Sequence, residues 1–198
     1  MPSFHDFRFL STDGKHNVFA RECAPDGEVR AVLQIAHGVA EHIYRYAPFM
    51  EFLAENGFVV VANDHLGHGK TAENEQELCF FAEKDGWNDV VSDMDTLHKL
   101  TAAKYPGVPY FLFGHSMGSF LTRTYIIDHP EGLKGVVISG TGQNPGAVVA
   151  AGKLMAKLEM IDNGPMYHSP TLDKLAFGSY NKKYDHVRTK LDWLTRDE

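Results

Sequence analysis

The strongest constraint on the fold comes from residues 109–119, which read Pro-Tyr-Phe-Leu-Phe-Gly-His-Ser-Met-Gly-Ser. An apolar run typical of a buried strand is followed at once by residues with the apolar spacing of a helix. Ser116 therefore lies in a tight strand-to-helix turn, between Gly114 and Gly118. Such a turn strains the serine backbone and brings strand and helix so close that flanking Cβ atoms would collide. We therefore expect Ser116 to be a nucleophile raised above a sheet, rather than part of an ordinary Gly-rich loop.

Strand and helix signals alternate through the middle of the chain. Short apolar runs without clean polar alternation, typical of strands buried on both faces, occur at 31–36, 58–62, 110–113 and 133–139. Helical spacing of apolar residues fills the intervals at 46–53, 87–101 and 117–128. A hairpin precedes them, with strands at 4–10 and 16–22 around an Asp-Gly turn. This order predicts an α/β fold with a mostly parallel sheet and helices on both of its faces.

The character of the chain changes after Gly140. Residues 147–160 have helical spacing, and the following stretch is rich in Tyr, Lys and Asp without any strand signal. We therefore divide the chain into the N-terminal part of an α/β core, residues 1–141, and a helical cap or lid, residues 142–198.

Composition narrows the class of protein. The chain has 198 residues, 43% of them hydrophobic, which is enough for one substantial core. Its net charge of -7 and its lack of a basic run argue against a nucleic-acid partner. Cys23 and Cys79 are far apart and fit two reduced thiols. No secretory signal and no apolar window of about 18 residues is evident, so we expect a soluble, cytoplasmic protein.

Three motifs together resemble the monoacylglycerol lipase and lysophospholipase-like branch of the α/β-hydrolases. They are His37-Gly38-Val39-Ala40-Glu41-His42, Asn63-Asp64-His65-Leu66-Gly67-His68-Gly69 and Gly114-His115-Ser116-Met117-Gly118. The resemblance implies the α/β-hydrolase fold and a serine hydrolase for monoacylglycerol- or lysophospholipid-like acyl esters. It implies a small-molecule acyl ester or lipid as partner, with no metal and no organic cofactor.

The resemblance also assigns roles to residues. Ser116 would attack the ester carbonyl, and the backbone N–H groups of Val39 and Met117 would form the oxyanion hole. The loop that begins at His37 and the turn at Ser116 each follow the carboxyl end of a predicted parallel strand, where ligands bind in open α/β sheets. His115 would orient the turn that holds Ser116. The expected lining of the site is His37, Gly38, Gly114, His115 and Gly118, and the expected braces of the loop beneath it are Asp64, His65 and His68.

The sequence departs from the family pattern mainly at the acid and the base of the catalytic triad. A Ser-Asp-His triad needs an Asp after a later strand and a His after the last one, and neither pattern follows Ser116 here. We therefore expect a chain that lacks the last two strands and two triad members and is inactive as given. The strand at 133–139 would then be an open apolar edge, prone to self-association.

Several alternatives stay open. The chain could be a non-catalytic α/β-hydrolase module used for binding, or an aminopeptidase, thioesterase or acyltransferase with the same turn. His37 or His68 could replace the missing base, although loop-bracing hydrogen bonds are the plainer interpretation. The histidine spacings match no metal-site motif.

Two helices carry side-chain patterns with less specific interpretations. The helix at 87–101 and the two residues before it include Asp85, Asp89, Asp93 and Asp95, which we interpret as a solvated face. The apolar residues of 154–161 in the cap fit either an acyl portal with peripheral membrane contact or ordinary packing. Residues 44–46 would start the first helix, and Arg45 could contact a polar head group.

Overall fold

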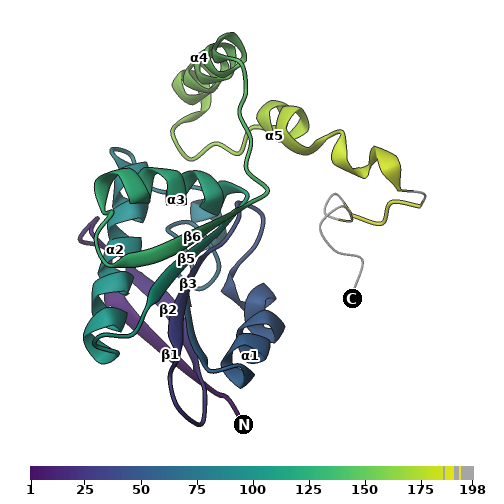
Figure 1. The fold of residues 1–198 in the computed structure, drawn as a ribbon. Coiled ribbons are helices and arrows are strands. Elements are labelled where there is room, and N and C mark those ends of the chain that lie inside the picture. Colours follow the sequence, from purple (N-terminus) through teal and green to yellow (C-terminus); the bar gives the residue numbers. More distant parts are fainter. Residues whose placement is uncertain (185, 190–191, 193–198) are drawn as a thin grey trace. The chain divides into compact units, whose positions relative to one another are not determined.

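The computed structural model describes residues 1–184, 186–189 and 192. The chain divides into two compact units, Met1–Gly142 and Gln143–Glu198. The first unit contains the sheet and the helices α1, α2 and α3 (Figure 1).

Six strands form the sheet of the first unit, in the order β1-β2-β4-β3-β5-β6. Their bounds are β1 (Ser3–Leu10), β2 (Asn17–Ala24), β3 (Ala31–Ala36), β4 (Phe58–Asn63), β5 (Tyr110–His115) and β6 (Leu133–Ser139). β2 pairs antiparallel with both β1 and β4, whereas β4, β3, β5 and β6 run parallel to one another. The predicted parallel sheet with an antiparallel hairpin at one end is therefore confirmed.

Helices cover both faces of this sheet (Figure 1). α1 (Ala47–Glu55) follows a short 3-10 helix, η1 (Ile43–Tyr46), and lies on one face. α2 (Gly86–Lys104) and α3 (Met117–Asp128) lie on the other. Every residue of β3 is buried, since Leu33 and Ile35 pack with the α1 side while Val32 and Ala36 pack with the opposite side. Burial on both faces explains why this strand shows no polar alternation.

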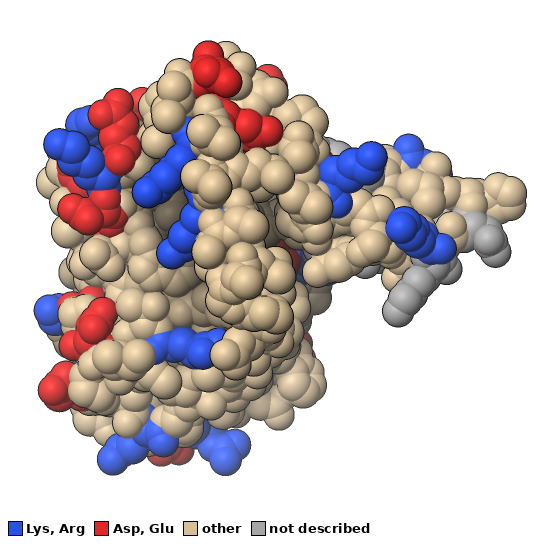
Figure 2. All heavy atoms as spheres, turned by 90° about the horizontal axis from the view of Figure 1, so that it is seen from above, with Lys and Arg blue, Asp and Glu red and all other residues tan. Residues whose placement is uncertain are grey.

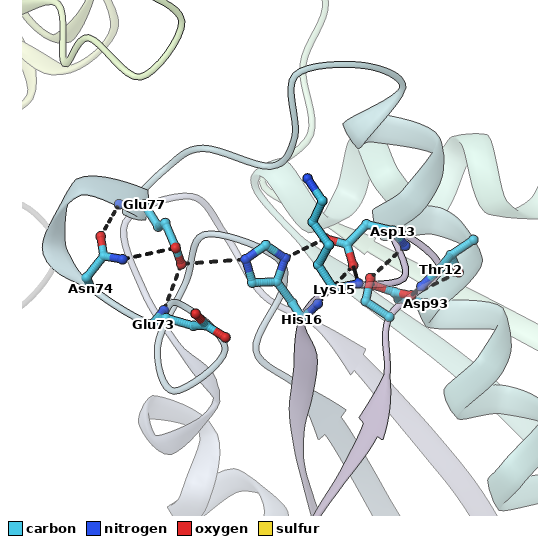
Figure 3. A network of polar contacts seen from close by, with 9 residues as sticks. Thr12, Asp13, Lys15, His16, Glu73, Asn74, Glu77 and Asp93 are labelled. Carbon is cyan, nitrogen blue, oxygen red and sulfur yellow. Dashed lines mark hydrogen bonds and ion pairs between the residues drawn. The ribbon is translucent and has the colours of Figure 1, made fainter.

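The predicted solvated acidic face of α2 is wrong at two of its four positions. Asp93 is only 2% exposed and Asp95 only 8%. The carboxylate of Asp93 accepts hydrogen bonds from the Ser11 hydroxyl at 2.7 Å, the Thr12 N–H at 2.7 Å and the Thr12 hydroxyl at 3.0 Å (Figure 3). The turn between β1 and β2 thus folds over α2 and covers Asp93, whereas Asp95 lies against Tyr125 of α3, whose hydroxyl donates to it at 3.3 Å. Burial raises the pKa of Asp93, and the three hydrogen bonds oppose that rise.

The same turn is joined to a second loop through His16. Its Nδ1 contacts the Asp13 carboxylate, and its Nε2 lies 3.7 Å from Glu77 Oε2 (Figure 3). Glu77 belongs to the 3-10 helix η2 (Glu75–Glu77), whose first turn is capped by the Asn74 side chain. His16 therefore bridges the β1–β2 turn and the loop that follows β4.

β6 is the last strand at its end of the described sheet (Figure 1). Val137 is 52% exposed and Ile138 is 39% exposed. Within the described residues, the strand is thus the open apolar edge that the sequence predicted.

The described part of the second unit is helical. It contains α4 (Gly146–Asn163), α5 (Pro170–Phe177) and the 3-10 helix η3 (Tyr180–Lys183), and the residues described there include no strand. The Ser169 hydroxyl accepts a hydrogen bond from the Leu172 N–H at 3.0 Å, which caps α5. In the part of the chain that the structure covers, no helix is both long enough and apolar enough to cross a bilayer.

Charged side chains of both signs are interspersed on the face shown in Figure 2. The face shows no continuous surface of Lys and Arg, in keeping with the net charge of -7.

Candidate active site

Ser116 occupies a strained position between β5 and α3. Its φ of 51° and ψ of -118° are uncommon for a residue with a side chain. The Ser116 N–H donates to the Ser139 carbonyl oxygen at 2.9 Å, and the Ser119 hydroxyl donates to the Ser116 carbonyl oxygen at 2.6 Å. The neighbouring strand and the first turn of α3 therefore hold the serine in a conformation that it would not adopt alone.

Glycine is required on both sides of this serine. A Cβ on Gly118 would lie 2.0 Å from the Ala36 carbonyl oxygen, and a Cβ on Gly114 would lie 2.4 Å from the Gly118 carbonyl oxygen. α3 thus begins in direct contact with the end of β3, which only a residue without a side chain permits.

The loop after β3 lies against Ser116. A Cβ built on Gly38 would be 3.2 Å from the Ser116 Cβ. Because β3 and β5 are neighbouring parallel strands, the loops at their carboxyl ends meet at one edge of the sheet. The structure therefore brings together the His-Gly-Val segment and the serine turn, as the motifs implied.

Three backbone polar groups of this loop are bound. The Gly38 N–H donates to Glu41 Oε1 at 2.6 Å, the Gly38 carbonyl oxygen lies 2.7 Å from His37 Nδ1, and the Val39 carbonyl oxygen lies 2.8 Å from His68 Nε2. Among the described residues, the Val39 N–H donates to no protein acceptor. Met117 is the first residue of α3, so its N–H has no acceptor within the helix.

His37 is fully buried, and its ring is hydrogen-bonded to the backbone of the loops after β3 and β4. Its Nε2 accepts a hydrogen bond from the His65 N–H at 3.0 Å, which assigns the ring proton to Nδ1 and makes Nδ1 the donor to the Gly38 carbonyl. Burial lowers the pKa of His37 well below its usual range, and the nearby His65 and His68 rings lower it further. His37 is therefore a neutral imidazole with both nitrogens occupied.

His68 also has a polar partner at each ring nitrogen, in this case two carbonyl oxygens. Its Nδ1 lies 2.9 Å from the Leu66 carbonyl oxygen and its Nε2 contacts the Val39 carbonyl oxygen. Neither His37 nor His68 has a ring nitrogen left for the Ser116 hydroxyl. The alternative in which one of them replaces the catalytic base is therefore wrong.

Asp64 holds the loop after β4 from inside. Oδ1 accepts from the Ile43 N–H at 2.9 Å, and Oδ2 accepts from the Lys70 N–H at 2.8 Å. Burial raises the pKa of this carboxyl, and the two backbone donors oppose that rise. Asp64 thus ties the start of η1 to the end of the His65–His68 segment.

His115 lies beside the end of β6. It is half-buried, and its Nδ1 lies 3.3 Å from the Ser139 hydroxyl. Because Ser139 also accepts the Ser116 N–H, His115 and Ser116 are held by the same residue.

Glu41, Arg45 and Tyr46 form a cluster that sequence reasoning did not assign to the site. The Tyr46 hydroxyl donates to Glu41 Oε1 at 2.7 Å, and Arg45 Nε lies 3.4 Å from Glu41 Oε2. The Glu41 side chain is only 4% exposed. A signal was present in the sequence, since Glu41 belongs to the first motif and Arg45 follows it four residues later.

No histidine of Met1–Gly142 is hydrogen-bonded to the Ser116 hydroxyl in the described structure. His129 follows the far end of α3, about 20 Å from Ser116 at 1.5 Å per helical residue, and its Nδ1 lies 3.6 Å from Asp95 Oδ1. His168 and His186 belong to the second unit. Among the described residues, no group of three or more His, Cys, Asp or Glu side chains is placed to hold a metal ion.

Comparison with known proteins places this geometry in a family. A family model described as serine aminopeptidase S33 matches residues 27–198. Monoglyceride lipase of Mus musculus is 32% identical over 129 residues, which are 65% of this chain and 40% of that protein. The monoglyceride lipase homolog of Monkeypox virus is 29% identical over 170 residues, 86% of this chain and 58% of that protein. The chain thus spans about half the length of these curated relatives.

Solved structures agree with the sequence relatives. A thermostable carboxyl esterase from Bacillus coagulans, in complex with glycerol, superposes with a TM-score of 0.83 at 32% identity, covering 96% of this chain and 61% of that one. A soluble variant of monoglyceride lipase from Saccharomyces cerevisiae shares the fold, with a TM-score of 0.64 at 20% identity over 84% of this chain and 54% of that one. The chain therefore belongs to the serine aminopeptidase S33 family, has the α/β-hydrolase fold, and resembles the monoglyceride lipases and esterases within it.

Proposed function

We propose that this chain carries the nucleophile and oxyanion hole of a serine ester hydrolase for monoacylglycerol- or lysophospholipid-like acyl esters. One observation supports this most: a strained serine adjoins a loop in which, among the described residues, the Val39 N–H donates to no protein acceptor. The names of the relatives, monoglyceride lipase and carboxyl esterase, support the acyl-ester class.

The proposed reaction proceeds through an acyl-enzyme. The Ser116 oxygen bonds to the ester carbonyl carbon while a base takes its proton, and the carbonyl electron pair moves to oxygen. The N–H groups of Val39 and Met117 would donate to this oxyanion, each stabilising the transition state by about 3–4 kcal/mol. Collapse of the intermediate expels the alcohol, which takes the proton from the base. Water then repeats the two steps on acyl-Ser116 and releases the fatty acid.

The base of this scheme is proposed to lie outside Met1–Gly142, because no histidine there contacts the Ser116 hydroxyl. We expect the 198 residues on their own to show no steady turnover, because the Asp and His patterns of the triad do not follow Ser116 in the sequence. A slower, stoichiometric acylation of Ser116 should remain, since an oxyanion hole alone retains a roughly 10³-fold advantage over water.

Two other functions compete with this one. The family description favours an aminopeptidase, in which the same serine would attack an aminoacyl amide. The lack of a base beside Ser116 favours a non-catalytic module that binds an acyl ligand without cleaving it.

Acylation with two classes of activated ester separates the three functions. The chain is incubated with p-nitrophenyl decanoate or with alanine p-nitrophenyl ester, and acyl adducts are measured by intact-mass spectrometry. Ser116→Ala gives the background to be subtracted. We expect the Ser116-dependent rate to be at least about tenfold higher with the fatty-acyl ester, the discrimination that one well-fitted apolar pocket provides. A preference for the aminoacyl ester would support the aminopeptidase, and no Ser116-dependent adduct with either ester would support the binding module.

Two contacts with larger partners are also proposed. The exposed apolar residues of α4 would rest on a lipid surface, and the open edge at β6 would pair with a second copy of the chain.

A further inference from the structure

The most unusual group near Ser116 is the carboxylate of Glu41. It is nearly buried, and a Cβ built on Gly38 would lie 2.8 Å from Glu41 Oε1 and 3.2 Å from the Ser116 Cβ. A negative charge this close to a developing oxyanion opposes the reaction unless it is compensated. Its presence therefore calls for a specific reason.

The reason lies in what the carboxylate binds. Oε1 accepts both the Gly38 N–H at 2.6 Å and the Tyr46 hydroxyl at 2.7 Å, while Oε2 faces Arg45 Nε at 3.4 Å. Burial, and after it the Glu41 carboxylate, raises the pKa of Tyr46, so that its hydroxyl stays protonated and donates. These donors compensate the charge and fix the position of the carboxylate.

We infer that Glu41 is a positioning residue that sets the direction of the Val39 N–H, an inference that rests on the function proposed above. Gly38 has no Cβ, so both of its flanking peptides could rotate easily. Glu41 holds the N–H on one side of Gly38, and His37 holds the carbonyl on the other.

The orientation of the Val39 N–H follows from these two anchors. The Val39 N–H and the Gly38 carbonyl belong to one planar trans peptide, so they point in opposite directions. The carbonyl points at buried His37, and the N–H therefore points away from the interior. Without the Glu41 anchor the His37–Gly38 peptide could turn, only the contact with His37 would hold the Gly38–Val39 peptide, and the Val39 N–H would be less firmly preorganised.

Two substitutions separate positioning from general stability. Glu41→Gln keeps a side-chain oxygen that can accept the Gly38 N–H, whereas Glu41→Ala removes the acceptor. Glu51→Ala, which truncates an exposed glutamate on α1, is the matched control. All variants are compared well below their melting temperatures, with folding checked by circular dichroism.

The first readout is hydrogen exchange of the Gly38 amide by NMR, and the second is the Ser116-dependent acylation rate with p-nitrophenyl decanoate. We expect Glu41→Ala to lose protection of the Gly38 amide and to acylate about 10- to 100-fold more slowly, as when an oxyanion donor is misplaced. Glu41→Gln should retain protection and stay within about fivefold of the wild type, because the neutral acceptor still makes the bond.

The outcomes are distinguishable. A folded Glu41→Ala variant that acylates as fast as the Glu51→Ala control overturns the positioning role, even if its melting temperature falls. A wild-type chain that acylates no faster than Ser116→Ala overturns the proposed function, and the positioning role falls with it. Retained Gly38 protection in Glu41→Ala would show that the anchor lies elsewhere and also overturns the inference.

Discussion

His16 shows how one imidazole can join two loops near the edge of the sheet. Burial lowers the pKa of His16, but the hydrogen bond to Asp13 and the charges of Asp13, Glu77 and Glu73 outweigh burial, so the pKa is raised. A raised pKa in the folded state means that the protonated ring stabilises the fold. This stabilisation is complete below the unfolded pKa of about 6.5 and is lost as the pH rises through the folded pKa.

His16→Gln should therefore destabilise the chain in a pH-dependent way. We expect the loss in free energy of unfolding to be about 1 kcal/mol near pH 5.5 and to shrink towards zero by about pH 9. Urea unfolding of both proteins at several pH values measures the difference. His5→Gln, on exposed β1, serves as the control and should show no such pH profile. A loss for His16→Gln that is equal at both pH values would contradict the assignment.

The site residues that could be assigned from the sequence are those whose structural constraint comes from their neighbours along the chain. Gly114 and Gly118 fit this description, because strand, turn and helix are contiguous around Ser116. Glu41 was not assigned, since its role depends on the folded distance between two loops. Asp93 was misassigned for the same reason: its partners lie more than 80 residues away along the chain, in the β1–β2 turn.

At the scale of elements, strands that appear in the sequence as short apolar runs were the most predictable. β3 and β6 have the bounds that their apolar runs indicated, whereas α4 is longer than the predicted 147–160. α4 carries three exposed apolar residues on one helical face: Leu154, Leu158 and Ile161, which are 60%, 56% and 77% exposed. Lys153 and Lys157 lie next to this stripe in the sequence. An apolar stripe beside cationic side chains is typical of a helix that rests on an anionic lipid surface.

Leu158→Asp should weaken binding to vesicles of phosphatidylcholine and phosphatidylserine by about tenfold or more, because a buried leucine contributes about 1.5–3 kcal/mol. Co-sedimentation with the vesicles measures the affinity. Ile127→Asp, which alters a 78% exposed residue of α3, is the matched control. Equal weakening by both variants would point to net charge rather than to the α4 stripe.

At the scale of the whole molecule, the sheet has one edge that invites pairing. β6 is seven residues long and leaves Val137 and Ile138 exposed at the end of the described sheet. Unpaired strand edges with apolar side chains and few charges favour association between chains. The parallel sheet could be expected from alternation of strands and helices, but neither the order of its strands nor what covers this edge follows from local pattern.

We expect the chain to associate as its concentration rises, and Val137→Lys to move that transition to at least about tenfold higher concentration, because charges on an edge strand oppose pairing. Sedimentation equilibrium measures both, with Ile127→Lys as the control for added charge. A monomer at every concentration, or association unchanged by Val137→Lys, would rule out pairing through β6.

The most direct test of the account is whether Ser116 itself accepts an acyl group. The chain is incubated with p-nitrophenyl decanoate, with and without added imidazole as a substitute base, and peptide mapping locates the adduct. The account predicts one decanoyl group on Ser116, formed slowly alone and faster with imidazole, and absent from Ser116→Ala. An adduct that persists in Ser116→Ala, or no adduct under either condition, would contradict a nucleophilic Ser116.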